Sequence, residues 1–336
     1  MILITGASGM LGSHVLYQLC LTDNKIRAIK RENSNIEVVL KVFSFYSDQP
    51  KRLLSKVEWV NADLLDEHQL DSAFSGVKKV YHCAAKISFS KKHENILFQT
   101  NVEGTKNIVD LCLHHGIEKL CHVSSVAAIG KTLDGGEATE QTLWADSPEN
   151  SSYAMSKYQG ELEIWRGIEE GLNAVIVNPS VILGPGNWDK SSARMFDLVW
   201  KGLRFYTPGG TGFVDVKDVA YLMIDLMESK VTSERFIISS ENLSYKQVLG
   251  HIADSLSKPK PRWIANRFIM ILAYGIQNFM TFFSGKEAQL SKELLKSGTK
   301  KTSYSNKKIL ESIPFSFQLI HQSCQEVSTR FIKDHS

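Results

Sequence analysis

The sequence predicts an α/β fold built on a doubly wound parallel sheet, and three observations lead to that prediction. The chain opens on a short apolar run that passes directly into a glycine-rich turn and then into an apolar pattern with helical spacing. Short β-branched runs then alternate with longer amphipathic stretches through the first half of the chain. Small or polar residues follow these runs, at the strand ends where such sheets bind their ligands.

Length and composition limit the classes of protein to consider. The 336 residues suffice for about two structural units, and 43% hydrophobic with 22% charged residues is typical of a soluble globular enzyme. A net charge of +3 without a basic tail gives no indication of a nucleic-acid partner. Five dispersed cysteines indicate a reducing compartment, and a core strand at the first residue leaves no room for a signal peptide. We therefore expect a cytoplasmic protein.

Residues 1–15 predict a strand, a turn and a helix that together bind a dinucleotide. Gly6 permits the tight turn after the strand, and Gly9 lets the backbone approach a pyrophosphate. Gly12 lets the helix pack close to the strand, with the phosphates facing free N–H groups at the helix N-terminus. An ordinary glycine-rich loop is the alternative, but the strand before and the helix after favour cofactor binding. The residues expected to contact the cofactor here are Gly6, Ser8, Gly9, Met10, Leu11 and Gly12.

A second strand is predicted over residues 25–29, and two cations, Lys30 and Arg31, follow it. At this position an Asp or Glu would bind both ribose hydroxyls, whereas a cation accommodates a 2′-phosphate. The two cations therefore favour NADP over NAD. NAD stays possible because Glu32 follows at once, and solvated loop charges are the alternative interpretation.

A third strand over residues 57–60 leads to Asp63 and Leu64. The Asp63 carboxylate is expected to accept a hydrogen bond from the adenine amino group, and the next backbone N–H to donate to the ring. Asp63 could equally be the N-cap of a helix that starts near Asp66.

A fourth strand ends in Ala84 and Ala85, whose small side chains let the backbone approach the cofactor. A long helix over residues 93–115 follows, and a fifth strand over 118–123 runs into Ser125. Ligands of a parallel sheet bind beyond the carboxyl ends of its strands. The candidate residues at such ends are Gly6, Arg31, Asp63, Ala84 and Ser125.

A helix over residues 151–170 carries Tyr153 and Lys157 four residues apart, so both lie on one face. A lysine ammonium beside a phenol is expected to lower the pKa of the phenol by favouring phenolate. Ser125 would hydrogen-bond the same substrate oxygen and stabilise its charge. With a nicotinamide, these side chains make a hydride-transfer site.

The spacing Tyr-x-x-x-Lys is not specific, since about one match is expected by chance in a chain of this length. It occurs again at Tyr304 and Lys308. No strand-end serine and no βα unit precede that copy, so we interpret it as structural.

Taken together, these segments resemble the extended short-chain dehydrogenase/reductase superfamily, which includes the NAD-dependent epimerase/dehydratase group. The resemblance implies that Ser125, Tyr153 and Lys157 are the catalytic residues and that Asn101 supports the site. It also implies that Asp63 and Leu64 hold adenine, that backbone near Pro179 orients the nicotinamide amide, and that Lys157 binds the nicotinamide ribose. The matching segments cover most of residues 1–225 and are 5–12, 63–64, 81–85, 101–105, 123–125, 153 with 157, 178–180, 184–186 and 213–220.

Two features direct the choice within this superfamily. Sugar-nucleotide epimerases usually carry an arginine just before a Phe-Val-x-Val-x-Asp stretch, whereas residues 209–213 here read Gly-Gly-Thr-Gly-Phe. The apolar run over 175–185 is closer to dihydroflavonol reductases and 3β-hydroxysteroid-dehydrogenase-like members. We therefore expect an NADP(H)-dependent carbonyl reductase or alcohol dehydrogenase that acts on a small-molecule carbonyl. The alternatives are a nucleotide-sugar epimerase or dehydratase with bound NAD, and a non-catalytic redox-sensing NADP-binding protein.

The resemblance also implies a division of the chain. Residues 1–186 would form an NAD(P)-binding domain of the Rossmann type, to which residues 213–240 return, and residues 187–336 would mainly form a smaller α/β substrate-binding portion. The apolar window 264–283 holds Arg267, so we expect an amphipathic lid or contact helix there and no transmembrane span. We expect no metal site, because adjacent His114 and His115 should point apart on a helix. A homodimer through the helices at 93–115 and 151–170 is possible.

Overall fold

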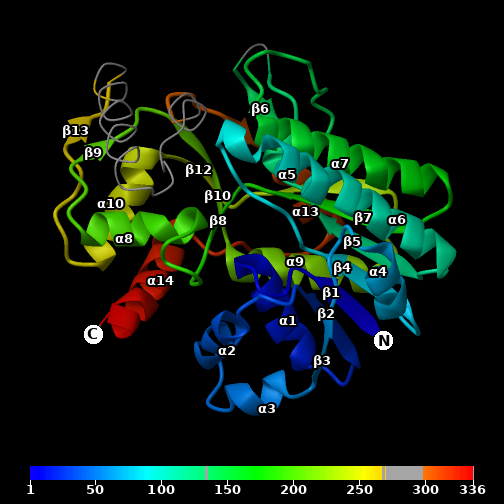
Figure 1. Cartoon of the computed structure of the whole chain (residues 1–336). Coiled ribbons are helices and arrows are strands. Elements are labelled where there is room, and N and C mark those ends of the chain that lie inside the picture. Colours follow the sequence, from blue (N-terminus) through cyan, green and yellow to red (C-terminus); the bar gives the residue numbers. More distant parts are fainter. Residues whose placement is uncertain (133–134, 267–268, 270–297, 336) are drawn as a thin grey trace.

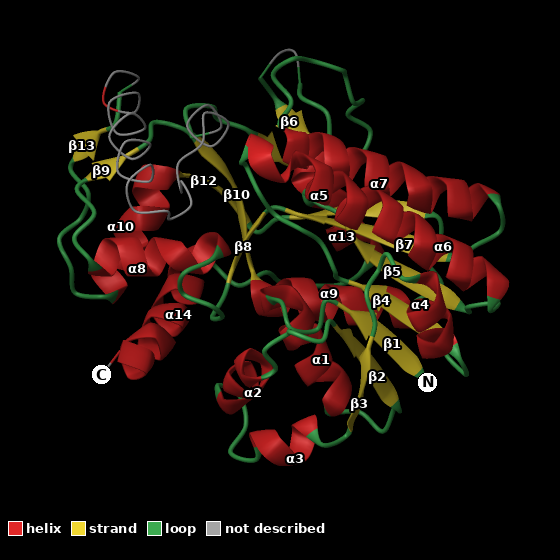
Figure 2. Cartoon of the chain, in the orientation of Figure 1, coloured by secondary structure: helices red, strands yellow, loops and turns green. Residues whose placement is uncertain are grey.

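The computed structural model describes residues 1–132, 135–266, 269 and 298–335, and a seven-stranded parallel sheet forms its centre (Figures 1 and 2). The strand order is β11-β7-β5-β4-β1-β2-β3, so the chain winds outward in both directions from its first strand. This confirms the predicted α/β class. The strands are β1 (Ile2–Thr5), β2 (Ile26–Lys30), β3 (Val57–Asn61), β4 (Lys79–His82), β5 (Lys119–Val123), β7 (Ala174–Pro179) and β11 (Glu234–Ile238).

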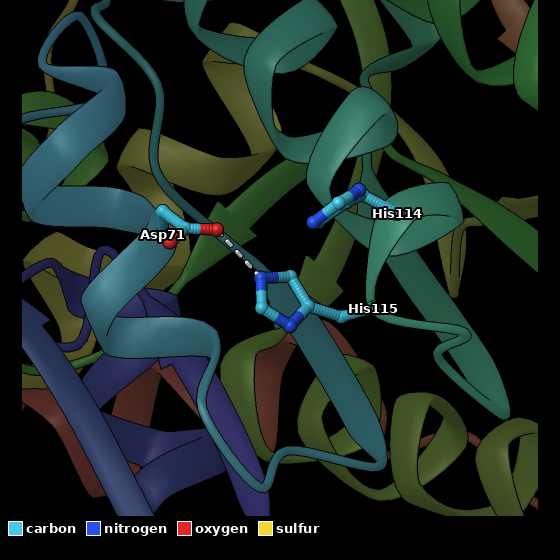
Figure 3. A group of neighbouring side chains, drawn as sticks. All are labelled: Asp71, His114 and His115. Carbon is cyan, nitrogen blue, oxygen red and sulfur yellow. Dashed lines mark hydrogen bonds and ion pairs between the residues drawn. The ribbon is translucent and has the colours of Figure 1, made fainter.

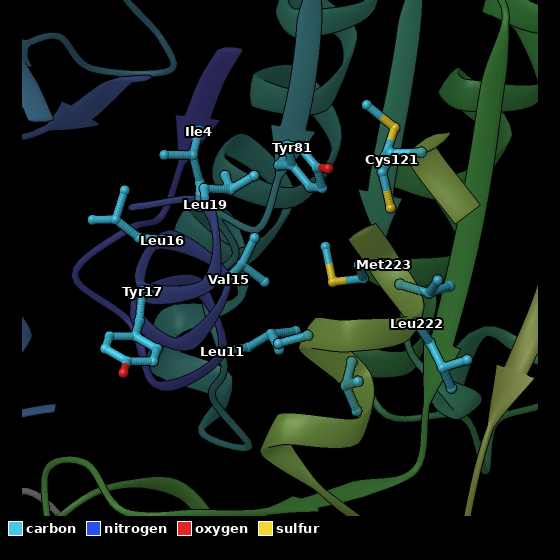
Figure 4. Close-up of a cluster of buried hydrophobic side chains, with 14 of the residues drawn as sticks. Ile4, Leu11, Val15, Leu16, Tyr17, Leu19, Tyr81, Cys121, Leu222 and Met223 are labelled. Carbon is cyan, nitrogen blue, oxygen red and sulfur yellow. The ribbon is translucent and has the colours of Figure 1, made fainter. Parts of the chain in front are cut away.

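Both faces of this sheet are buried, because successive side chains of each strand enter different cores. Ile2 and Ile4 point into one hydrophobic cluster and Leu3 into the other. The first cluster, part of which is drawn in Figure 4, is covered by α1 (Met10–Cys20), α2 (Glu37–Ser44), α9 (Val216–Glu228) and α13 (Lys307–Ser312). The second is covered by α4 (Glu67–Phe74), α6 (Gly104–His114) and α7 (Ser152–Glu169). The short α3 (Pro50–Leu54) lies beside α2.

A second group of elements packs around its own hydrophobic cluster. Its three-stranded sheet has the order β12-β10-β8, formed by β8 (Val181–Leu183), β10 (Gly210–Asp215) and β12 (Glu241–Ser244). Its helices are α8 (Arg194–Trp200), α10 (Tyr245–Ser255) and α14 (Ile320–His335). Two short pairs join distant segments: β6 (Glu137–Ala138) with β14 (Ser303–Tyr304), and β9 (Phe205–Tyr206) with β13 (Trp263–Ile264).

The chain returns to the large sheet after β10. Helix α9 packs against α1 in the first cluster, and β11 then pairs in parallel with β7 at the edge of the sheet. Residues 216–238 thus complete the layers that the first 186 residues begin.

The helix expected over 93–115 is interrupted. It consists of α5 (Glu94–Phe98), a π-helical turn over Gln99–Glu103 and α6. Such wide turns are rare and frequently lie at functional sites, and this one contains Asn101.

Among the residues that the structure describes, no helix combines the length and the apolar character that crossing a membrane requires. The predicted amphipathic helix over 264–283 lies mostly outside the described residues.

Candidate active site

The glycine turn after β1 admits no side chains at two of its positions. Gly6 has a φ of +69°, and a Cβ added to it would lie 2.5 Å from the backbone nitrogen of Ala84. A Cβ on Gly12 would lie 2.1 Å from the carbonyl oxygen of Gly6. Gly12 therefore lets α1 pack against the turn after β1, as the sequence pattern predicts, and Gly6 also lets the segment after β4 approach, which was not predicted.

Helix α1 begins at this turn with its N-terminus open to an anion. Gly9 is its N-cap, so no side chain caps the first N–H groups, and its first turn carries no acidic residue. Met10 is the first helical residue, and Leu11 is buried in the core, so only the backbone of Leu11 can face a phosphate (Figure 4). Ser8 lies in the turn itself. This arrangement fits the pyrophosphate of a dinucleotide.

The expected adenosine-binding residues lie at the ends of β2 and β3. Lys30, the last residue of β2, donates a 2.7 Å hydrogen bond to Asn61 Oδ1, and Arg31 is exposed just beyond it. Asp63 Oδ1 accepts from the backbone N–H of Leu65 at 3.0 Å.

The alternative role for Asp63 as a helix cap is wrong. The side chain of Asp66 accepts from the N–H of Gln69 at the start of α4, and Asp66 is the N-cap. The carbonyl of Leu64 accepts from Asn107 Nδ2 at 2.9 Å, which fastens the segment after β3 to α6.

Ser125, Tyr153 and Lys157 come together at the carboxyl end of β5. Helix α7 starts after Ser151, whose side chain accepts from the N–H of Ala154, and it presents Tyr153 and Lys157 on one face. Lys157 Nζ donates to the carbonyl of Val123 at 2.8 Å, two residues before Ser125. The structure thus joins the helix to the strand end that carries the serine.

The serine hydroxyl is oriented by its two partners. Ser125 Oγ accepts from the N–H of Ala127 at 3.1 Å and forms a side-chain hydrogen bond with Tyr153. The backbone N–H of Ala127 and the phenol of Tyr153 thus hold the serine hydroxyl beside the phenol. Tyr153 is only partly buried.

The electrostatics differ from the sequence expectation. Burial raises the pKa of Tyr153, and the hydrogen bond from Ser125 opposes that change only in part. The prediction of a lowered phenol pKa is therefore wrong for this structure, because Lys157 directs its ammonium to a carbonyl and desolvation dominates. Burial also lowers the pKa of Lys157 to about 8, although Glu161 and Cys83 counteract it.

Asn101 braces the site from the π-helical turn. Its Nδ2 donates to Ser156 Oγ at 2.9 Å and to the carbonyl of Lys86 at 3.0 Å, and its Oδ1 accepts from the N–H of Lys86 at 2.8 Å. The side chain therefore joins the residue before Lys157 to the segment after Ala84 and Ala85.

A buried polar chain, not foreseen from the sequence, runs from the glycine turn to Asn101. Thr5 Oγ1 accepts from the N–H of Ala84 at 3.2 Å and lies 2.7 Å from His82 Nδ1. His82 Nε2 lies 3.1 Å from Thr105 Oγ1, which donates to the carbonyl of Asn101. Since burial lowers the pKa of His82 to about 3, its ring is neutral at physiological pH.

Two residues with no role assigned from the sequence lie behind the serine: Glu161, and Asn178 of the matching segment 178–180. Asn178 precedes Pro179 at the end of β7 and donates to the carbonyl of Ser125 at 3.0 Å. Its other partner is the carboxylate of Glu161, four residues after Lys157. The spacing Tyr-x-x-x-Lys-x-x-x-Glu was the available signal for Glu161.

The second Tyr-x-x-x-Lys copy is divided between two elements. Tyr304 lies in β14 and Lys308 in α13, and Lys308 is paired with Glu234. This agrees with its structural interpretation.

Among the described residues, one group of three side chains has ligand atoms close enough together to hold a metal ion (Figure 3). The ligand atoms of Asp71, His114 and His115 lie within 4.8 Å of one another, so the expectation that the two histidines diverge is wrong. His115 is the C-cap of α6 and has left the helical conformation, which turns its ring toward Asp71 at 2.8 Å. A surface hydrogen bond accounts for this contact.

Comparison with known proteins identifies the family. The profile of the NAD dependent epimerase/dehydratase family matches residues 2–239. Sterol demethylase protein B of Methylococcus capsulatus is 27% identical over 77% of this chain and 76% of its own length. An inferred dihydroflavonol 4-reductase of Synechocystis is 30% identical over 77% of this chain and 73% of its own length.

Solved structures share the architecture. The crystal structure of gox2253 has a TM-score of 0.81 and 25% identity, with 99% of this chain and 98% of the other covered. UDP-glucose 4-epimerase of Thermotoga maritima has a TM-score of 0.78, with 100% of this chain and 99% of the other covered. At 18% identity it shows the fold alone. From the family profile and its relatives, the chain belongs to the NAD dependent epimerase/dehydratase family of extended short-chain dehydrogenases/reductases and is an NAD(P)-dependent oxidoreductase.

Proposed function

We propose that the chain is an NADP(H)-dependent carbonyl reductase or alcohol dehydrogenase that acts on a small-molecule carbonyl. The observation that carries the proposal is the hydrogen-bonded pair of Ser125 and Tyr153 beside Lys157, at the sheet edge that also carries the glycine turn. When bound, the cofactor supplies or accepts a hydride at its nicotinamide. The residues that would hold it are those of the turn, Asp63, Leu64, Ala84, Ala85 and backbone near Pro179.

Each side chain of the site has a separate task in the reducing direction. Ser125 donates its hydroxyl proton in a hydrogen bond to the carbonyl oxygen of the substrate. Tyr153 transfers its phenolic proton to that oxygen, and its raised pKa keeps it protonated and ready as an acid at neutral pH. Lys157 carries the positive charge that stabilises the phenolate left behind, and it also contacts the nicotinamide ribose.

Arg31 supports the preference for NADP. It is exposed at the carboxyl end of β2, whereas its neighbour Lys30 already binds Asn61. We assign the 2′-phosphate to Arg31.

The names of several relatives support carbonyl reduction. Tetraketide alpha-pyrone reductase 2 of Arabidopsis thaliana is 29% identical over 74% of this chain and 80% of its own length. Anthocyanidin reductase of the same plant is 26% identical over 77% and 80%.

A nucleotide-sugar epimerase or dehydratase is the second candidate, favoured by the fold shared with UDP-glucose 4-epimerase. The stretch before Phe213 argues against it. A Cβ on Gly212 would lie 2.4 Å from Ser239 Oγ and one on Gly210 would lie 2.7 Å from the carbonyl of Leu243, so neither position has room for an arginine.

The remaining expectations are part of the same proposal. Residues 1–186 with 213–240 bind the cofactor, and residues 187–336 mainly bind the substrate. In that portion Trp188 and Tyr206 are buried core residues, whereas Phe205 is exposed. We further propose a cytoplasmic enzyme that dimerises through α6 and α7.

A panel of aldehydes and ketones, assayed with NADPH and NADH side by side, tests the proposal. We expect carbonyl-dependent oxidation of NADPH, with NADH a weaker donor. Tightly bound NAD in the purified protein, together with no oxidation of either cofactor, would favour the second candidate.

The variant Arg31→Ala tests the cofactor preference. Loss of a charge-assisted contact should raise the KM for NADPH about tenfold to a hundredfold and leave that for NADH unchanged. Arg52→Ala, at an exposed arginine of α3, is the matched control. An equal effect of Arg31→Ala on both cofactors would refute the assignment.

A further inference from the structure

A carboxylate lies buried one helical turn beyond Lys157. Glu161 is 1% exposed, and carboxylates are rarely this buried unless they are paired. Tyr153, Lys157 and Glu161 follow one another at intervals of four residues, so they share one face of α7. That face contacts β5 through Lys157 and β7 through Glu161.

Both oxygens of Glu161 are hydrogen-bonded. Oε1 accepts from Arg235 at 2.9 Å, and Oε2 accepts from Asn178 Nδ2 at 2.7 Å. Arg235 is held in turn by the carbonyl of Glu140, to which it donates two hydrogen bonds. Arg235 and Glu161 both line a surface groove of about 800 Å³.

Asn178 connects this carboxylate to the serine. Its two Nδ2 protons are both used, one by Glu161 and the other by the carbonyl of Ser125. The amide has only one possible orientation, because a turned amide would place its oxygen against two acceptors. Glu161 thereby determines which way Asn178 faces, and Asn178 holds the backbone of Ser125.

We propose that Glu161 is a positioning residue of the active site, which fixes Ser125 through Asn178 and places a negative charge beside Lys157. The proposal rests on the proposed function of Ser125 and Lys157. It assigns to Glu161 no contact with substrate or cofactor.

The groups around Lys157 show why this charge matters. On α7 itself Glu161 interacts electrostatically with Lys157, and so do His82 and His122 from the sheet and Cys83 just after β4. Burial lowers the pKa of both histidines far enough to keep them neutral, and raises that of the thiol to about 12.

Glu161 is therefore the charged group that opposes the desolvation of the ammonium. Burial is the largest cause of the lowered pKa of Lys157, and Glu161 is the first of the groups that counteract it. Without this carboxylate the pKa of Lys157 falls further.

The variant Glu161→Gln tests the proposal, with Glu163→Gln as its matched control. Glu163 lies on the same helix but forms a surface ion pair with Arg166. The first measurement is the titration of the Lys157 15Nζ resonance without substrate, which needs no activity. The second is the pH profile of carbonyl reduction.

In Glu161→Gln we expect Lys157 to titrate about one pH unit lower. We expect kcat/KM to fall about tenfold to a hundredfold because Ser125 loses its support, and the alkaline limb of the profile to move to lower pH. Glu163→Gln should match the wild type in the Lys157 titration, in kcat/KM and in the alkaline limb of the pH profile. If Glu161→Gln does not fold, the double variant Glu161→Gln/Arg235→Gln, which leaves no unpaired charge, replaces it.

The outcomes separate this proposal from the proposed function. If the wild type reduces carbonyls and Glu161→Gln has the same Lys157 titration and pH profile as Glu163→Gln, only the role of Glu161 is overturned. If the wild type reduces no carbonyl but Lys157 still titrates at lower pH in Glu161→Gln, the electrostatic coupling is supported and the proposed function is refuted.

Discussion

The same spacing, tyrosine followed four residues later by lysine, occurs in two regions of the molecule with opposite consequences. Tyr153 and Lys157 share one face of α7, and the lysine reaches the backbone of β5. Tyr304 and Lys308 are divided between β14 and α13, so the spacing has no helical meaning there.

The two lysines also differ in their electrostatic surroundings. The ammonium of Lys308 is paired with Glu234, donates to the carbonyl of Arg235 at 3.0 Å and lies 4.9 Å from the centre of the Phe236 ring. Lys157 is buried, and burial lowers its pKa to about 8. The comparison indicates how to tell the two lysines apart. A buried ammonium with a lowered pKa is typical of a functional site, whereas an ammonium in a partly exposed ion pair is typical of a structural contact.

Substitution of the two tyrosines should change the rate most unequally. Tyr153→Phe removes the proton donor and should lower kcat about a thousandfold or more, while NADPH binding measured by fluorescence is retained. Tyr304→Phe should leave kcat within about a factor of two, because it removes only hydrogen bonds of β14. Equal rates in the two variants would refute the assignment of Tyr153.

The lysines should respond in opposite directions in stability. Lys157→Met should abolish most turnover yet raise the free energy of unfolding, since keeping a charge with a pKa of about 8 instead of 10.5 costs ~3 kcal/mol. Because the pKa of Lys157 is lower in the folded state, this cost is complete below pH 8 and fades as the pH rises toward 10.5.

Lys308→Met should instead lower the free energy of unfolding by about 1 kcal/mol or less, because it breaks a partly exposed ion pair. Urea unfolding of both variants at pH 7 and 10 measures the difference. A Lys157→Met variant less stable than the wild type at pH 7 would contradict the account.

A smaller effect is expected at the hydroxyls that contact the two phenols. Ser125→Ala should lower kcat about a hundredfold and move the rising limb of alcohol oxidation to higher pH, because the serine hydrogen bond lowers the pKa of Tyr153. Thr211→Val removes the corresponding hydrogen bond to Tyr304 and should leave the pH profile unchanged. Identical pH profiles for the wild type and Ser125→Ala would show that Ser125 does not influence the pKa of Tyr153.

Much of the fold was predictable because its signals are local. The strand, turn and helix around Gly6 lie within 20 residues, and five strands of the large sheet were expected in order. The interruption at Gln99–Glu103 was not, since Asn101 in this turn bonds to Lys86 and Ser156, and such tertiary contacts leave no local pattern.

The candidate catalytic residues were predictable from helical spacing, strand ends and the family resemblance, whereas the contacts that hold them were not. Tyr153 and Lys157 follow helical spacing, but Arg235 reaches Glu161 across 74 residues, which no local pattern reports. The direction of the pKa shift of Tyr153 was predicted wrongly, because burial depends on packing that the spacing does not contain.

A crystal structure of the chain with NADP and an alcohol product bound would show directly whether Tyr153, Ser125 and the glycine turn form one active site. We predict the pyrophosphate at the N-terminus of α1, the 2′-phosphate beside Arg31, and the product oxygen within hydrogen-bond distance of both Tyr153 Oη and Ser125 Oγ. A phenol directed away from the nicotinamide, or a pyrophosphate bound elsewhere than the turn around Gly9, would contradict the account.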